Sequence, residues 1–129
     1  MRSIILDTCA FLWWIDDSAE LGEASKALIA DPNNNIYVSA ATAWEISIKT
    51  NLKKLTAPSN IPLVIQNQGF IEIPILGKHG EQAGQLPMHH KDPFDRVIIS
   101  QAMESGYEVM TSDTKFSLYK TITVLDSRK

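Results

Sequence analysis

The sequence predicts an α/β fold with an open, mostly parallel sheet that is covered by helices on both faces. Short apolar segments of strand length alternate along the chain with longer segments whose apolar residues follow helical spacing. This alternation is typical of parallel sheets, whose strands are buried on both faces. The length of 129 residues and the apolar fraction of 44% suit one domain, which we expect to span residues 1–129. The pattern leaves the order of the strands open.

Five segments are expected to form the strands. The first is Ser3-Ile4-Ile5-Leu6, and the second, at residues 36–38, follows a turn-rich segment at residues 31–35. The other three cover residues 70–73, 107–110 and 122–125.

Helices are expected between the strands. The clearest cover residues 23–30, 41–52 and 93–105, the last of which stops before Gly106. Residues 60–68 and 78–85 are weaker helical candidates. After the first strand, the segment Phe11-Leu12-Trp13-Trp14-Ile15 is apolar on every face, which indicates burial in the core or cover by a partner.

Composition and charge limit the class of protein. No apolar run is long enough to span a bilayer, and Asp7 interrupts the apolar N-terminal segment, so we expect no membrane segment. The single cysteine, Cys9, excludes an internal disulfide, in agreement with a cytoplasmic location. A formal net charge of −3 argues against a protein that binds nucleic acid, although carboxylates that hold metal ions contribute to this sum.

Four acidic residues from four segments are expected at one edge of the sheet. Asp7 follows the first strand and Asp113 the fourth, while Glu45 and Asp95 lie early in the helices at residues 41–52 and 93–105. Ligands of such sheets bind beyond the carboxyl ends of the strands. Carboxylates that converge there repel one another unless they share a cation. Oxygen ligands without a Cys/His cluster indicate Mg²⁺ or Mn²⁺ rather than structural zinc.

Each acid also has a structural explanation when it is taken alone. Asp7, Asp92 and Asp113 are suited to cap the N-termini of helices, and Glu45 is suited to pair with Lys49 four residues later. Capping explains these positions one at a time and gives no reason for the acids to converge.

The predicted donor set suits hydrolysis of phosphodiester bonds. A bound dication lowers the pKa of a water molecule that attacks the phosphorus, and can stabilise the departing oxygen. Products with a 5′-phosphate and a 3′-hydroxyl are expected. Asp7, Glu45 and Asp95 are the expected ligands, and Asp113 is expected to hold a second metal ion or to orient the water.

Four short motifs follow one another along nearly the whole chain, each occurring once. They are Leu6-Asp7-Thr8, Trp44-Glu45-Ile46-Ser47-Ile48-Lys49, His90-Lys91-Asp92-Pro93-Phe94-Asp95-Arg96 and Thr111-Ser112-Asp113. As an ordered set they resemble the motifs of PIN-domain ribonucleases, specifically VapC-type toxins of toxin–antitoxin pairs. The resemblance implies a three-layer PIN-like fold with a central parallel five-stranded sheet, and assigns Asp7, Glu45, Asp95 and Asp113 to the metal site. It also implies an RNA substrate, a small DNA-binding antitoxin as partner, and a homodimer.

Basic residues near the predicted site are candidates for substrate binding. Lys49 and Lys53 lie on the helix face that carries the glutamate, where they can meet RNA phosphates or remain solvated surface charges. Arg96 lies in the acidic helix and can bind a phosphate or pair with an acid. His90 precedes that helix and can contact RNA or serve as a neutral structural group.

Other activities of open α/β sheets fit the sequence poorly. A haloacid-dehalogenase-like site needs Asp-x-Asp after the first strand, where this chain has Asp7-Thr8-Cys9. A response-regulator receiver needs an aspartate after the third strand, which here is followed by Pro74. The remaining alternative is a non-catalytic module that binds RNA or an antitoxin and holds a metal ion only for structure.

Overall fold

Five parallel strands form one central sheet in the computed structural model, which describes residues 1–129. The strands are β1 (Ser3–Leu6), β2 (Asn35–Ser39), β3 (Ile71–Ile73), β4 (Glu108–Thr111) and β5 (Thr123–Asp126). Their order across the sheet is β3-β2-β1-β4-β5, and every neighbouring pair is parallel. The predicted α/β class with five parallel strands is therefore confirmed.

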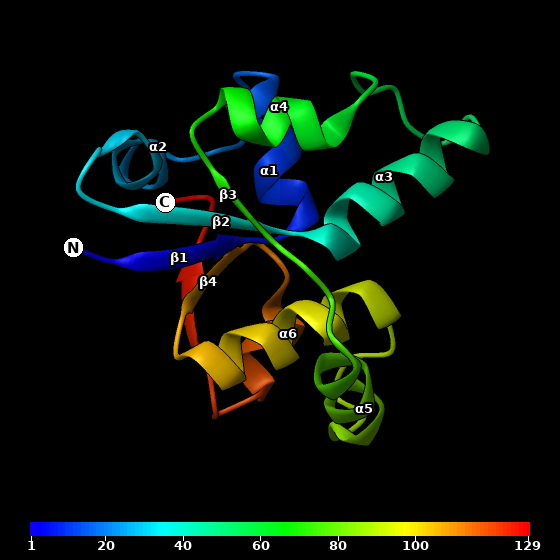
Figure 1. Ribbon diagram of the computed structural model, residues 1–129. Coiled ribbons are helices and arrows are strands. Elements are labelled where there is room, and N and C mark those ends of the chain that lie inside the picture. The colour runs from blue at the N-terminus through cyan, green and yellow to red at the C-terminus, as the bar shows by residue number, and fades with distance from the viewer.

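Helices cover both faces of this sheet. They are α1 (Thr8–Ile15), α2 (Glu23–Ala30), α3 (Ala40–Asn51), α4 (Ile61–Asn67), α5 (Gly77–Gln85), α6 (Pro93–Ser105) and the 3₁₀ helix η1 (Thr114–Leu118). In Figure 1, α1, α2 and α4 lie on one side of the sheet and α5 and α6 on the other. The expected strands and the expected helices α2 to α6 agree with these bounds to within one residue at each end. None of the helices is both long and apolar enough to cross a membrane.

Side chains of the central strands alternate between two cores, one on each face of the sheet. Ile4 and Leu6 of β1 pack with Phe11 of α1 and with residues of α2 and α4. Ile5 lies on the opposite face, with Ile98 of α6. This alternation follows from the period of two in a strand. A sheet buried on both faces gives a rigid base for residues at its edge.

The apolar segment in α1 is explained mainly by packing within the chain. Phe11 is fully buried and makes an edge contact with Phe70. Trp14 packs on the same Phe70 and donates from its indole N–H to Gln68 (2.9 Å). Trp13 lies under the Arg128 guanidinium, 5.0 Å from the ring centroid. All three aromatic residues thus have contacts within the chain, but only Phe11 is fully buried.

An exposed apolar stripe instead lies on α3 and its C-cap. Trp44 and Leu52 are 58% and 56% exposed, and Ile48 between them is 36% exposed. Four large apolar residues, Trp44, Ile46, Ile48 and Leu52, occur in the predicted helix at residues 41–52, and only Ile46 is fully buried. The reason is positional, because α3 runs outward from the end of β2 and projects beyond the sheet (Figure 1).

Candidate metal centre

The parallel register brings the carboxyl ends of the central strands level. Leu6 of β1 pairs with Val38 of β2 and with Met110 of β4. The next residue, Asp7, therefore lies beside Thr111, whose hydroxyl donates to Asp7 Oδ2 (2.6 Å). Strands β1 and β4 also flank the point at which the strand order reverses. Open α/β sheets bind their ligands at such points.

A cavity of about 530 Å³ opens at this edge of the sheet, and Asp7, Glu45, Asp95 and Asp113 all line it. The sequence prediction that these acids from four segments converge is thus realised in the fold. The cavity wall is completed by Thr8, Cys9, Leu12, Trp13, Asp16, Lys49, Lys54, Leu55, Asp92 and Ser112.

Asp7 is held firmly at the base of this cavity. Its Oδ1 accepts from the backbone N–H of Ala10 (2.8 Å), which makes it the N-cap of α1. The side chain is buried, and burial raises its pKa to about 6, against the opposing effect of the hydrogen bonds from Thr111 and Ala10. The nearby carboxylates of Asp113 and Glu45 raise this pKa further.

One carboxylate oxygen of Glu45 accepts a hydrogen bond and the other accepts none. Oε2 accepts a hydrogen bond from Lys49 Nζ at 2.6 Å. Oε1 is buried and accepts no hydrogen bond. The pair with Lys49 that the sequence spacing suggested is therefore present. A buried carboxylate oxygen without a donor is unusual and costly, which makes it a candidate ligand atom.

Asp95 lies in the first turn of α6, close to His90 and Asp113. Burial raises the pKa of Asp95 to about 8, and the carboxylates of Asp92, Asp7, Glu45 and Asp113 raise it as well. No helix cap or hydroxyl group offsets these effects. Asp95 is therefore the acid that gains most from a cation.

His90 joins two of the acids, a role that was not foreseen. Its Nε2 lies 2.8 Å from Asp95 Oδ2 and 3.0 Å from Asp113 Oδ2, although neither oxygen lies in line for a hydrogen bond. The donor atoms of His90, Asp95 and Asp113 all lie within 4.8 Å of one another, as expected for a group that can hold a metal ion. His90 Nδ1 accepts from the backbone N–H of Asp92, so Nε2 is the ring nitrogen that faces the two acids. Direct contact of His90 with RNA stays a prediction.

Two acids of this edge also cap helices, as their sequence positions suggested. Asp92 Oδ1 accepts from the backbone N–H groups of Phe94 and Asp95 at the start of α6. Asp113 Oδ1 accepts from the backbone N–H of Lys115 at the start of η1, while its Oδ2 faces His90. Capping therefore fixes these carboxylates without removing them from the cavity.

The lysines of the cavity differ from those expected. Lys49 lines it, but Lys53 does not, because α3 ends at Asn51 and Lys53 adopts a left-handed conformation with φ of 59°. The turn instead brings Lys54 to the cavity wall. Its backbone N–H bonds back to the Lys49 carbonyl (2.9 Å). Helical spacing alone could not predict this turn after α3, which brings Lys54 rather than Lys53 to the cavity.

Arg96 does not line the cavity, and its expected role in substrate binding is corrected. Its buried guanidinium donates to four backbone carbonyls, those of Ala83, Leu86, Pro87 and His90. Four of its five N–H donors are therefore used within the protein. Arg96 holds the segment between α5 and α6 and positions His90 through its carbonyl group.

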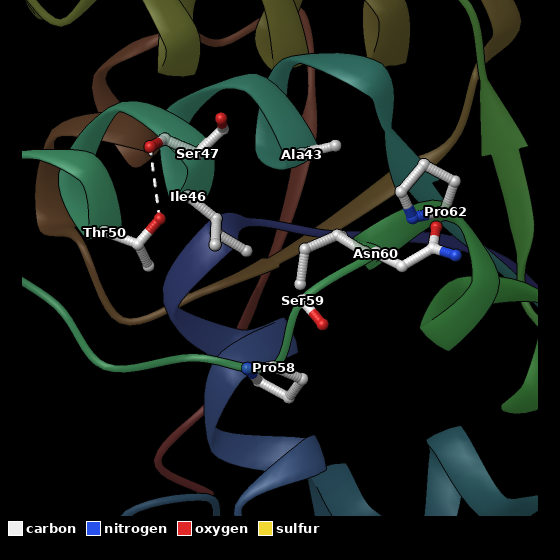
Figure 2. A pocket seen from close by; sticks show the side chains of 9 residues that line it. Ala43, Ile46, Ser47, Thr50, Pro58, Ser59, Asn60 and Pro62 are labelled. Atoms are coloured by element: carbon white, nitrogen blue, oxygen red, sulfur yellow. Dashed lines mark hydrogen bonds between the residues drawn. The ribbon is translucent and has the colours of Figure 1, made fainter.

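A second hollow, of about 380 Å³, lies between α3 and the segment before α4 (Figure 2). It is lined by Ala43, Ile46, Ser47, Thr50, Pro58, Ser59, Asn60, Ile61 and Pro62. None of these side chains is ionisable, and the Thr50 hydroxyl already donates to the Ser47 carbonyl (3.1 Å). This hollow therefore offers no acid, base or charged ligand, and the candidate chemistry lies in the acidic cavity.

The acidic cavity fits a hard divalent cation. Its donors are carboxylate oxygens, which Mg²⁺ and Mn²⁺ prefer. The vacant Glu45 Oε1 and the raised pKa values of Asp7 and Asp95 show that the negative charge here is not fully compensated by the protein. A cation shared by these acids would supply that compensation.

Comparison with known families agrees with this geometry. The model of the PIN domain matches residues 4–121, which include all four acids of the cavity. The chain belongs to the PIN-domain family. A search among curated proteins found no match to this PIN domain.

Solved structures share the architecture of this PIN domain over almost its full length. VapBC2 from Rickettsia felis, bound to a DNA fragment from its promoter, has a chain that is 17% identical, with a TM-score of 0.72, covering 96% of this chain and 98% of that chain. DNA-bound VapBC from Salmonella typhimurium has a chain that is 18% identical, with a TM-score of 0.66 and coverage of 98% of both chains. A toxin–antitoxin complex from Klebsiella pneumoniae gives 20% identity and a TM-score of 0.65, covering 96% of this chain and 97% of that chain. At these identities the likeness establishes the fold.

Proposed function

We propose that this PIN domain is a metal-dependent endoribonuclease and the toxin of a VapBC-type toxin–antitoxin pair. The observation that carries the proposal is the convergence of Asp7, Glu45, Asp95 and Asp113 on one cavity, where Glu45 Oε1 is buried without a donor. Helix capping does not account for that vacant oxygen.

The roles of the residues follow from their contacts. Asp7, Glu45 and Asp95 would hold Mg²⁺ or Mn²⁺, which supplies a water of lowered pKa and stabilises charge on the phosphate. Thr111 and the α1 N-terminus hold the Asp7 carboxylate in place. Asp113 and His90 lie beside Asp95, where a carboxylate can accept a proton from the attacking water or join a second metal site.

Single-stranded RNA is the substrate that we infer. Lys49 and Lys54 are the ammonium groups on the cavity wall and are the candidates to meet its phosphates. Ammonium groups that meet phosphates contact the backbone rather than base edges, so these lysines would favour no particular sequence. An RNA substrate also implies action in the cytoplasm.

An antitoxin and a second copy of the chain are the inferred protein partners. Support for an antitoxin comes from the similar folds, which were solved as toxin–antitoxin complexes. Support for a homodimer comes from the exposed stripe of Trp44, Ile48 and Leu52, in which Trp44 has an edge contact with Phe94 but all three side chains stay exposed.

The test is incubation of the purified protein with defined single-stranded RNAs, with Mg²⁺, with Mn²⁺ and with a chelator. Cleavage is expected only with the ions. Asp95→Asn should lower the rate by at least about 100-fold, because it removes one charged ligand of the ion. Glu81→Gln, an exposed acid of α5 without an ion pair, is the matched control and should cleave like the wild type.

Two results would reject the proposal. One is cleavage by Asp95→Asn at the wild-type rate, which would indicate a contaminant. The other is Mn²⁺ binding by the wild type without cleavage of any RNA tested, with a loss of stability on removal of the ion. That result would support the alternative of a non-catalytic module with a structural metal ion.

A further inference from the structure

The carboxylate of Glu45 already has a cation as its partner. Lys49 Nζ lies 2.6 Å from Glu45 Oε2, one helical turn away on α3. The Glu45 side chain is only 6% exposed, whereas that of Lys49 is 47% exposed. The charge that neutralises this buried acid is thus supplied by a side chain that reaches it from solvent.

No other contact keeps Lys49 in this position. Its ammonium group has no second hydrogen bond and no second ion pair. The four-carbon stem of a lysine is flexible, and its ammonium group is readily hydrated. Movement of Lys49 away from Glu45 therefore breaks one hydrogen-bonded pair and weakens the longer-range attraction of Lys49 to Asp92 and Asp95. It can occur without a change in the backbone.

A dication and the Lys49 ammonium group compete for the same carboxylate. An ion that uses Glu45 as a ligand would lie within a few ångströms of Nζ, where two positive charges repel strongly. We propose that Lys49 is an internal counter-cation of the metal-free site, which leaves Glu45 when a divalent ion binds. This inference rests on the proposed metal site and concerns how that site is filled.

The exchange has a consequence for substrate binding. Lys49 lines the cavity together with Lys54, and the released ammonium group stays on that wall. The metal-free protein hides this positive charge in a pair with Glu45, whereas the metal-bound protein presents it to an incoming phosphate. Metal binding and phosphate binding would then favour each other.

Metal affinity tests the exchange directly. The full chain and its Lys49→Met variant are titrated with Mn²⁺ alone by isothermal titration calorimetry, without RNA. Methionine keeps an unbranched stem and removes the charge. Loss of the competing ammonium group should tighten Mn²⁺ binding by roughly fivefold. In the wild type, NMR of the lysine ammonium groups should show the Lys49 signal shift on addition of Mg²⁺.

The matched control is Lys54→Met, which removes the same charge from the same wall but no pair with Glu45. It should tighten binding less than Lys49→Met does. Equal gains in the two variants, or unchanged or weaker binding by Lys49→Met, would overturn the exchange. Circular dichroism establishes that each variant is folded.

A third variant separates this inference from the proposed function. If the wild type binds Mn²⁺ and Glu45→Gln binds it weakly, the metal site stands whatever Lys49→Met does. If the wild type binds no Mn²⁺, both the metal-dependent function and the exchange are rejected. RNA cleavage is not used as the readout, so a poor choice of RNA affects neither conclusion.

Discussion

At the scale of the residue, helix capping uses only one of the two carboxylate oxygens of Asp7 and of Asp113. Asp7 uses Oδ1 to cap α1, and Asp113 uses Oδ1 to cap η1, while the other oxygens face Thr111 and His90. Capping and convergence, which compete as explanations of the sequence, coexist here because a carboxylate has two acceptor atoms. The cap fixes the side chain that the cavity uses.

The pH dependence of stability is one prediction at this scale. In the metal-free protein, the free energy of unfolding should fall as the pH rises from about 4 to about 8. The unfolded chain releases these protons near the ordinary pKa of 3.8, whereas folded Asp7 and Asp95 keep theirs up to about 6 and about 8. The folded state thus holds more protons over this range, and stability is lost on ionisation. Urea unfolding over a series of pH values measures it.

The Asp95→Asn variant and added Mn²⁺ provide the controls for the pH dependence of stability. The variant should lose the part of the decline that lies nearest pH 8, because its amide does not ionise. Saturating Mn²⁺ should restore stability at the high-pH end, with release of protons on binding. A stability that rises with pH in the metal-free wild type would contradict the burial of these acids.

A second prediction at this scale concerns Arg96. Lysine in its place keeps the charge but lacks the planar fork, so several of the four buried carbonyls lose their donor. Arg96→Lys should lower the free energy of unfolding by about 3 kcal/mol. Arg2→Lys, at an exposed pair with Glu108, is the control and should leave the free energy of unfolding nearly unchanged. A fully stable Arg96→Lys that fails to cleave RNA would instead return Arg96 to the substrate site.

At the scale of the element, helix ends decide which side chains reach the cavity. The left-handed Lys53 ends α3 and brings Lys54 to the cavity wall. Asp92 begins α6 and thereby sets the place of Asp95 in its first turn. Gly106 ends α6 in the left-handed region, with φ of 72°, and allows the chain to enter β4. These residues act on the site through the path of the backbone.

Alanine substitutions at two glycines should change the free energy of unfolding in opposite directions. Gly84 lies within α5, and a Cβ atom there meets no other atom within 4 Å. Gly84→Ala should therefore raise the free energy of unfolding by about 0.5 to 1 kcal/mol. Gly106→Ala should lower it by about 1 kcal/mol, because φ of 72° is unfavourable for alanine although space is free. Thermal unfolding of both variants measures this, and changes of the same sign would contradict the assigned conformations.

At the scale of the whole molecule, the two cores leave one apolar surface uncovered. Sheet and helices bury both faces of the strands, but the projecting end of α3 exposes Trp44, Ile48 and Leu52. The stripe begins beside the acidic cavity, since Glu45 and Lys49 belong to the same helix. Cover of this stripe by a second copy would place another chain close to the cavity.

The prediction for the whole molecule is the effect of a charge on this stripe. Leu52→Lys should shift a homodimer towards the monomer, because a lysine is costly to bury in an apolar interface. Sedimentation velocity over a range of concentrations measures this shift. Leu118→Lys, at a 50% exposed position on η1, is the matched control and should leave the association state unchanged. A wild type that stays monomeric at high concentration would contradict the homodimer.

The sequence by itself determined the five strands, the helices α2 to α6, the α/β class and the convergence of four acids at one edge of the sheet. Hydrophobic periodicity and capping residues act over a few positions, so they can be read locally, as at Asp92 and Gly106. That the whole chain folds as one domain stays a prediction. Tertiary structure alone decided the strand order, the place of His90 between Asp95 and Asp113, the turn of Lys54 towards the cavity and the burial of Arg96. These features depend on contacts between segments that lie far apart in sequence. They also depend on which buried carbonyl and carboxylate groups still need a hydrogen-bond donor after the chain has packed.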